Sequence, residues 1–97
     1  MFELEFTESA LEDLRSLRKT EQSLVLDEIE QRLPAEPLTA SKNRKQLRPN
    51  DLAAWQLRVG RHRIFYDVDL ERSVVVIKAI GEKVRERLLF RGKEFKL

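Results

Sequence analysis

The sequence predicts an α+β fold in which two antiparallel N-terminal helices pack on one face of a small, twisted, mainly antiparallel four-stranded sheet. Three observations support it. Residues 2–6, FELEF, alternate apolar and acidic side chains as a strand does; two segments with apolar residues at helical spacing follow; and three strand-like runs occupy residues 54–80. The predicted order is β-α-α-β-β-β, with a short C-terminal helix after the last strand.

Length and composition set the limits of this fold. The 97 residues are expected to form one domain, residues 1–97. The chain has no cysteine and a single histidine, which excludes thiol chemistry and argues against a zinc site, so no metal or cofactor is expected. No segment approaches the roughly 20 apolar residues of a membrane span. We therefore expect a cytoplasmic protein with no membrane partner.

The N-terminal strand is followed by the two predicted helices. Thr7 is expected to cap the first, about residues 8–18, and Thr20 the second, about residues 21–33, which Pro34 ends. The apolar residues expected to face the core are Leu11, Leu14 and Leu17 in the first helix and Val25, Ile29 and Leu33 in the second.

The second half of the chain begins with a long connection. Residues 34–53 contain all three prolines and show no periodicity, and a compact domain seldom keeps so long a connection without using it. The run VVVIKAI, residues 74–80, is nearly continuously apolar and suits a central strand. Gly81 is expected to end that strand, and residues 82–90, EKVRERLLF, to form the C-terminal helix.

Two strands, about residues 54–59 and 62–69, are expected to form a hairpin whose two-residue turn is Gly60-Arg61. The turn places Val59 opposite His62 and sets the faces of both strands. The side chains expected to face the helices are Trp55, Leu57, Val59, Ile64, Tyr66 and Val68, and those expected on the open face are Gln56, Arg58, Arg63 and Phe65.

The same register places Arg58 directly opposite Arg63. Two guanidinium groups in that position repel each other unless an anion lies between them. Asp67 or Glu82 of the same chain would serve, and so would a phosphodiester, whose oxygens match the guanidinium fork two at a time. Both interpretations are open from the sequence.

Charge is unevenly distributed along the chain. Residues 1–41 carry ten acidic and four basic residues, a balance of −6, whereas residues 42–63 carry seven basic residues and one acidic residue, a balance of +6. Such asymmetry is typical of a basic face that meets a polyanion, although a solvated surface has the same composition. By alternation, Lys78 is expected to point toward this face together with Val76, whereas Ala79 is expected to face the helices. Phe65 either stacks on a base or packs beneath the C-terminal helix, the second being the favoured interpretation.

Two segments carry a resemblance to a known family: LRVGRHRIFYDVD in the hairpin and VVVIKAIGEK in the last strand. With the order of elements, they resemble the RelE/ParE superfamily of bacterial toxins from type II toxin–antitoxin pairs, over nearly the whole chain. The resemblance implies a cognate antitoxin partner, with residues 42–63 and 82–90 as candidate surfaces. Its RelE branch implies a ribosome-dependent mRNA endoribonuclease with ribosome and mRNA as partners. The alternatives are a non-catalytic, ParE-like inhibitor of DNA gyrase, or a degenerate toxin that retains only antitoxin binding.

Carried over by position, the resemblance assigns Arg63 to the scissile phosphate, and the chemistry of 2′-OH attack adds Lys83 and Arg58 as catalytic groups that stabilise charge. Ala54 and Gln56 stand where the RelE branch has lysines, and Leu89 where it has a C-terminal Tyr or His. The candidates for proton transfer are His62, Tyr66, Glu82 or a lysine of lowered pKa. The residues expected to bind RNA are Arg61, His62, Lys42, Arg44, Lys45, Arg48, Lys78 and Arg85.

Overall fold

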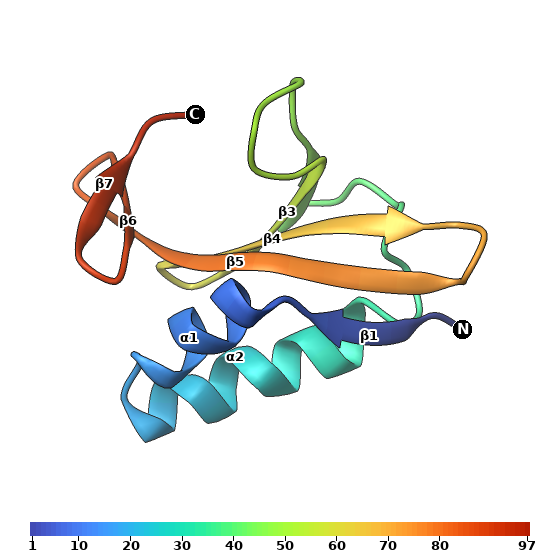
Figure 1. Cartoon of the computed structure of the whole chain (residues 1–97), viewed down its shortest axis with the longest axis horizontal. Helices are drawn as coiled ribbons and strands as arrows, with labels where there is room; N and C mark the ends of the chain where they lie inside the picture. Colours follow the sequence, from blue (N-terminus) through green and yellow to red (C-terminus); the bar gives the residue numbers. More distant parts are fainter.

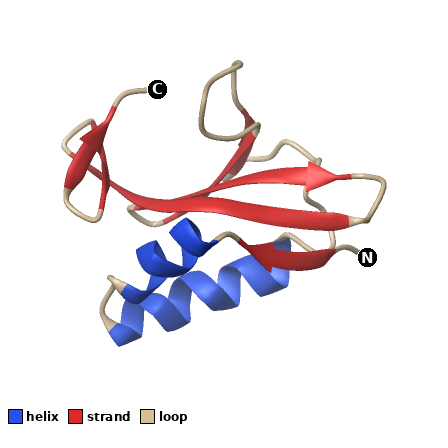
Figure 2. Cartoon of the chain, in the orientation of Figure 1, coloured by secondary structure: helices blue, strands red, loops and turns tan.

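The computed structural model describes all 97 residues, as two helices on one face of a seven-stranded sheet (Figures 1 and 2). The strands β2 to β7 are hydrogen-bonded in chain order, and β1 pairs in parallel with the first half of β5. The elements are β1 (Glu3–Phe6), α1 (Glu8–Arg15), α2 (Lys19–Arg32), β2 (Arg44–Gln46), β3 (Trp55–Val59), β4 (His62–Asp69), β5 (Val74–Val84), β6 (Arg87–Phe90) and β7 (Lys93–Phe95).

The first helix begins as predicted but ends early. The Thr7 hydroxyl accepts a hydrogen bond from the Ala10 backbone N–H at 3.1 Å and caps α1. The Ser16 hydroxyl donates a hydrogen bond to the Asp13 backbone carbonyl at 2.6 Å. This bond satisfies a carbonyl of the last turn, and the helix ends before residue 18.

The second helix begins earlier than predicted. Its N-cap is Arg18, whose backbone is extended, so the expectation that Thr20 caps this helix is wrong. The Gln22 side chain donates to the Leu17 carbonyl at 2.8 Å and ties the start of α2 to the end of the preceding segment. Neither helix is long and apolar enough to cross a membrane.

The main core lies between the helices and the sheet. Val25 and Ile29 of α2 and Leu33, its C-cap residue, are fully buried there, as predicted. The predicted helix-facing residues of the hairpin join them, and Val68 packs at the margin of this cluster. The Tyr66 hydroxyl donates to the Pro37 carbonyl at 2.7 Å, and burial raises the pKa of this phenol.

The C-terminal part of the sheet corrects the prediction most strongly. No C-terminal helix forms: β5 continues through Gly81 to Val84, and β6 and β7 follow as successive antiparallel strands. Arg85 and Glu86 form the turn between β5 and β6, with φ of 49° and 72°. A nine-residue helix is marginal alone, whereas strand pairing extends a ladder already formed by β5.

A third extra strand lies within the predicted connection 34–53. It is β2, which pairs antiparallel with β3 so that Arg44 lies opposite Leu57 and Lys45 opposite Gln56. The sheet therefore has seven strands where four were predicted. The Asn50 side chain organises the loop that follows, because it donates to the Arg48 and Ala53 carbonyls and accepts from two backbone N–H groups.

A second, smaller core lies on the sheet face opposite the helices. Phe65, fully buried, packs there with Ala53, Ala79 and Leu88, and its ring centroid lies 5.7 Å from that of Phe90. The register of β4 and β5 shifts between Phe65 and Tyr66, which puts Ala79 opposite Phe65. Ala79 was expected on the helix side, and that expectation is wrong because the irregularity breaks the alternation. The packing role favoured for Phe65 is confirmed, with strands as its partners in place of a helix.

One carboxylate is buried between α1 and the sheet. Asp13 is 2% exposed, and its Oδ2 accepts the Ile80 backbone N–H at 2.9 Å. Its Oδ1 lies 2.9 Å from Arg91 Nε, at the turn between β6 and β7. Burial nevertheless raises the pKa of Asp13, against the opposing effects of these two contacts.

This raised pKa has a defined effect on stability. Because the folded-state pKa lies above the unfolded one, Asp13 contributes most stability at low pH, and that contribution falls as the pH rises through the folded pKa. We expect the free energy of unfolding of the natural chain, minus that of Asp13→Asn, to increase as the pH is lowered from 7 to 3. Urea unfolding of both proteins at each pH measures it, and a difference that shrinks on acidification would mean that Arg91 dominates.

Candidate functional site

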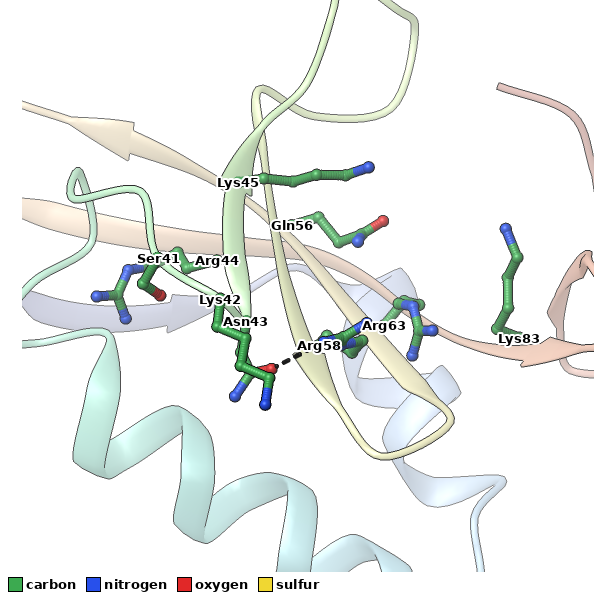
Figure 3. Close-up of a pocket in the computed structure, with 9 residues that line it drawn as sticks. All are labelled: Ser41, Lys42, Asn43, Arg44, Lys45, Gln56, Arg58, Arg63 and Lys83. Atoms are coloured by element: carbon green, nitrogen blue, oxygen red, sulfur yellow. Dashed lines mark hydrogen bonds between the residues drawn. The ribbon is translucent and has the colours of Figure 1, made fainter.

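A cationic groove of about 280 Å³ opens on the sheet face opposite the helices. No acidic and no apolar residue lines it. In Figure 1 the loop after β2 and the hairpin β6–β7 rise from this face at separate places. The residues that line the groove are Ser41, Lys42, Asn43, Arg44, Lys45, Gln56, Arg58, Arg63 and Lys83 (Figure 3).

Strand register brings the groove's cations together. Arg58 on β3 lies directly opposite Arg63 on β4, as predicted from the turn, and Gly60 has the positive φ, 59°, that this turn requires. Arg63 in turn lies opposite Gly81 on β5, so Lys83, two residues further on, points to the same face. Three adjacent strands therefore contribute one cation each.

No carboxylate neutralises the two opposed arginines. Arg58 Nη2 donates to Asn43 Oδ1 at 3.2 Å. Arg63 Nη1 donates to the backbone carbonyls of Gly60, at 2.8 Å, and His62, at 3.0 Å. Burial, followed by the charge of Arg58, lowers the pKa of Arg63.

The two acidic residues that could have paired with these arginines are engaged elsewhere. Asp67 accepts the Ala54 backbone N–H at 2.7 Å, and Glu82 lies 3.0 Å from Arg61 Nε. Six arginines of the chain do form ion pairs with its own acids, and Arg58 and Arg63 are not among them: the six are Arg32, Arg44, Arg61, Arg72, Arg87 and Arg91. The two opposed guanidinium groups of the groove therefore have no ion-pair partner within the chain.

Comparison with known proteins identifies the family. Residues 4–86 match the description "ParE toxin of type II toxin-antitoxin system, parDE". The chain belongs to this toxin family. The resemblance to the RelE/ParE superfamily stated from the hairpin and the last strand is thereby confirmed.

Solved structures of RelE toxins have the same fold. The RelBE2 toxin–antitoxin complex from Mycobacterium tuberculosis contains a chain 28% identical to this toxin, with a TM-score of 0.73 over 84% of this chain and 96% of that one. The isolated E. coli RelE toxin is 22% identical, with a TM-score of 0.72 over 88% and 87%. The archaeal RelE–RelB complex from Pyrococcus horikoshii OT3 is 22% identical, with a TM-score of 0.69 over 87% and 97%. Curated protein sequences give no match.

Three of the basic residues expected to bind RNA lie on the helix side of the toxin's sheet. Arg44 borders the groove, but it is 7% exposed and its Nε donates to the Thr39 carbonyl at 2.6 Å, pointing away from the other cations in Figure 3. Arg61 pairs with Glu21 and Glu82, and His62 is 4% exposed. Pairing with Leu57 turns Arg44 toward the helices, and alternation does the same to His62, so the side chains of these two residues are buried, whereas that of Arg61 stays exposed beside its acidic partners.

The remaining basic residues divide between the groove and other surfaces. Lys42 and Lys45 line it. Lys78 lies in a different hollow, together with Arg48 and Asp67, five residues before Lys83 along β5. Arg85 lies in the exposed turn between β5 and β6.

Most side chains considered for proton transfer are unable to reach the groove. His62 and Tyr66 are buried on the helix side, and Glu82 is paired with Arg61. Apart from its arginines, the titratable side chains that line the groove are those of Lys42, Lys45 and Lys83. The structure has no group of three or more His, Cys, Asp or Glu residues arranged to hold a metal ion.

Sequence reasoning missed the contribution of Asn43 to the groove, and it named Lys45 without the strand that places it. Asn43 accepts two hydrogen bonds from Arg58. Its side-chain Oδ1 accepts from the Arg58 guanidinium, and its backbone carbonyl accepts the Arg58 backbone N–H at 2.7 Å. Lys45 stands directly across from Gln56 on the neighbouring strand. Both depend on β2, which the connection's lack of periodicity concealed.

Gly81 allows the hairpin β6–β7 to approach the groove. A Cβ at this position would lie 2.8 Å from the Phe90 ring and 2.9 Å from the Leu89 carbonyl oxygen. We expect Gly81→Ala to lower the free energy of unfolding by about 1–3 kcal/mol because β6 must move away from β5. Chemical denaturation measures the loss, and faster amide exchange in residues 87–95 would locate it. Lys78→Ala, a change on the same strand without a clash, is the control; equal stability of the two variants would contradict the expectation.

Proposed function

We propose that this toxin is a ribosome-dependent mRNA endoribonuclease that inhibits translation, with the cationic groove as its phosphodiester site. One observation carries the proposal: Arg58 and Arg63 face each other across two strands, beside Lys83, and no acid of the chain neutralises them. A phosphate between two guanidinium forks removes their repulsion and forms charge-assisted hydrogen bonds with both.

The reaction that fits this groove is attack of a ribose 2′-oxygen on the adjacent phosphorus. The new P–O2′ bond replaces the P–O5′ bond, leaving a 2′,3′-cyclic phosphate and a 5′-hydroxyl. Arg63 and Arg58 bind the phosphate oxygens as negative charge develops, and Lys83 adds a third cation. Removal of the 2′-OH proton and protonation of the leaving 5′-oxygen fall to the lysines of the groove or to groups of the ribosome.

An antitoxin partner is part of the same proposal. The relatives from Mycobacterium tuberculosis and Pyrococcus horikoshii were solved as complexes with their antitoxins. For this toxin, an acidic segment of the antitoxin lying over the cationic groove would match its charge and block the phosphodiester site. The hairpin β6–β7 replaces the predicted helix as the second candidate surface.

A second candidate function is non-catalytic inhibition of DNA gyrase. It is favoured by the ParE description of the matching family and by Ala54, Gln56 and Leu89, which supply no proton-transfer group where the RelE branch has one. In that case the cationic groove serves as a binding surface.

Primer extension on a reporter mRNA in a cell-free translation reaction separates the two functions. Discrete cuts that appear only with ribosomes support the nuclease. Growth arrest without cuts, together with inhibition of supercoiling by purified gyrase, supports the alternative. Neither activity, with antitoxin binding retained, identifies a degenerate toxin.

A further inference from the structure

An ion-pair cluster lies behind the cationic groove, on the helix side of the same hairpin turn. The guanidinium of Arg61 bridges two acids from different elements: Glu21, in the first turn of α2, at 2.7 Å, and Glu82, on β5, at 3.0 Å. The second oxygen of Glu21 lies 3.8 Å from Nε2 of the buried His62. We call Arg61, Glu21 and Glu82 the turn clamp, because together they fix the turn to a helix and to a neighbouring strand.

The backbone of the turn that this clamp holds in place forms hydrogen bonds with two cationic residues of the groove, Arg63 and Lys83. The carbonyls of Gly60 and His62 accept hydrogen bonds from the Arg63 guanidinium. The Arg61 carbonyl between them accepts the Lys83 backbone N–H at 2.7 Å. Three consecutive carbonyls thus locate both residues, and no carboxylate does so. The position of the Arg63 guanidinium therefore depends on where residues 60–62 lie.

We propose that Arg61, Glu21 and Glu82 are positioning residues that set Arg63 and Lys83 for phosphodiester binding. The inference rests on the proposed function only in taking the groove's ligand to be a phosphodiester. A turn released from α2 leaves the Arg63 guanidinium free to rotate, and its repulsion from Arg58 then drives the two groups apart. Held by the clamp, the two forks remain spaced to share one phosphate, so the binding site is preorganised.

This role has an unusual consequence for charge. Removing the negative charges of Glu21 and Glu82 makes the chain more positive, and long-range electrostatics alone would then strengthen binding to a polyanion. Loss of the clamp predicts the opposite, weaker binding. The sign of the change therefore distinguishes positioning from general electrostatics.

The experiment measures binding of a fluorescently labelled single-stranded RNA oligonucleotide to the full chain by anisotropy, at one fixed ionic strength. The test variant is Glu21→Gln/Glu82→Gln. The matched control is Glu5→Gln/Glu28→Gln, which removes the same charge and breaks ion pairs with Arg72 and Arg32, away from the groove. Thermal unfolding verifies that each variant is folded, and Glu21→Gln alone is used if the double variant is not.

We expect the clamp variant to raise Kd about three- to tenfold, and the control to leave it equal or slightly lower. In an Arg63→Ala background the clamp variant should weaken binding much less, because only the effect through Lys83 is left, a result that a general loss of structure would not produce. Clamp and control variants that bind equally well, or a clamp variant that binds more tightly, would overturn the inference. Wild type and Arg63→Ala with equal affinity would instead show that the groove is not the phosphodiester site, which defeats the proposed function itself.

Discussion

Replacing Arg63 with alanine is expected to reduce ribosome-dependent mRNA cleavage by about 100-fold or more and to abolish growth arrest. Removing one preorganised donor that contacts the developing negative charge costs about 10² to 10³ in rate in other enzymes, and Arg63 is held by the turn carbonyls beneath the proposed phosphate position. Primer extension on the reporter mRNA, as a function of toxin concentration, measures the loss.

The fold is expected to survive this change. Arg63 forms no ion pair, and its removal also relieves its repulsion from Arg58. We therefore expect a thermal unfolding temperature equal to or slightly above that of the natural chain. Arg32→Ala, on the far side of the molecule in α2, is the control for loss of one arginine and should retain full cleavage. Cleavage retained by Arg63→Ala would remove this residue from the mechanism.

Arg63→Lys separates charge from geometry. Lysine keeps the positive charge but lacks the planar fork that bonds two phosphate oxygens and the two turn carbonyls together. We expect intermediate cleavage, well below that of the natural chain. Activity equal to that of the natural chain would mean that only the charge at this position matters.

The hairpin was predictable because its register follows from one local feature. Gly60 at the first turn position fixes which residues face each other, so Arg58 and Arg63 were placed correctly, as was the helix-facing side of both strands. The apolar stripe of α2 is similarly local. Such features need no knowledge of distant contacts.

The errors lie where distant contacts decide the structure. The segment 82–90 has spacing compatible with either a short helix or a strand, and the choice is made by pairing with β5 and by the buried Phe65 that Leu88 covers. Strand β2 is three residues long and exists only because β3 lies beside it. The irregularity next to Lys78 puts Ala79 on the same face as Phe65, and no feature of the sequence marks it.

The candidate site was predictable in its center but not at its boundary. Alternation turns His62 away from Arg63, although His62 and Arg61 were both expected among the RNA-binding residues. In the structure Arg63 and Arg61 lie on opposite faces of the sheet, Arg63 in the groove and Arg61 in the turn clamp. Adjacent residues of a strand serve opposite faces, so a basic run in a strand supplies only part of its charge to one surface.

Replacing Phe65 with alanine is expected to lower the free energy of unfolding by about 3–5 kcal/mol, a large part of the 5–15 kcal/mol typical of a small domain. The ring is fully buried between β4, β5 and the C-terminal hairpin, against Leu88 and Phe90. The backbone of a sheet cannot collapse into the space that the ring leaves, so the cavity persists. Urea unfolding monitored by the fluorescence of Trp55 measures the loss.

Phe95→Ala is the matched control, because Phe95 lies in the same aromatic cluster, 5.7 Å from Phe90, but is 37% exposed. It should cost about 1 kcal/mol or less, since much of its ring already contacts water. The comparison also measures the packing role of Phe65 and distinguishes it from stacking on a base. A stacking residue on an open face would lose RNA affinity at unchanged stability when replaced. If Phe65 supports the hairpin, its replacement lowers the free energy of unfolding of the protein. At temperatures where Phe65→Ala is still folded, its RNA affinity should then equal that of the natural chain, because Arg58 and Arg63 keep their positions.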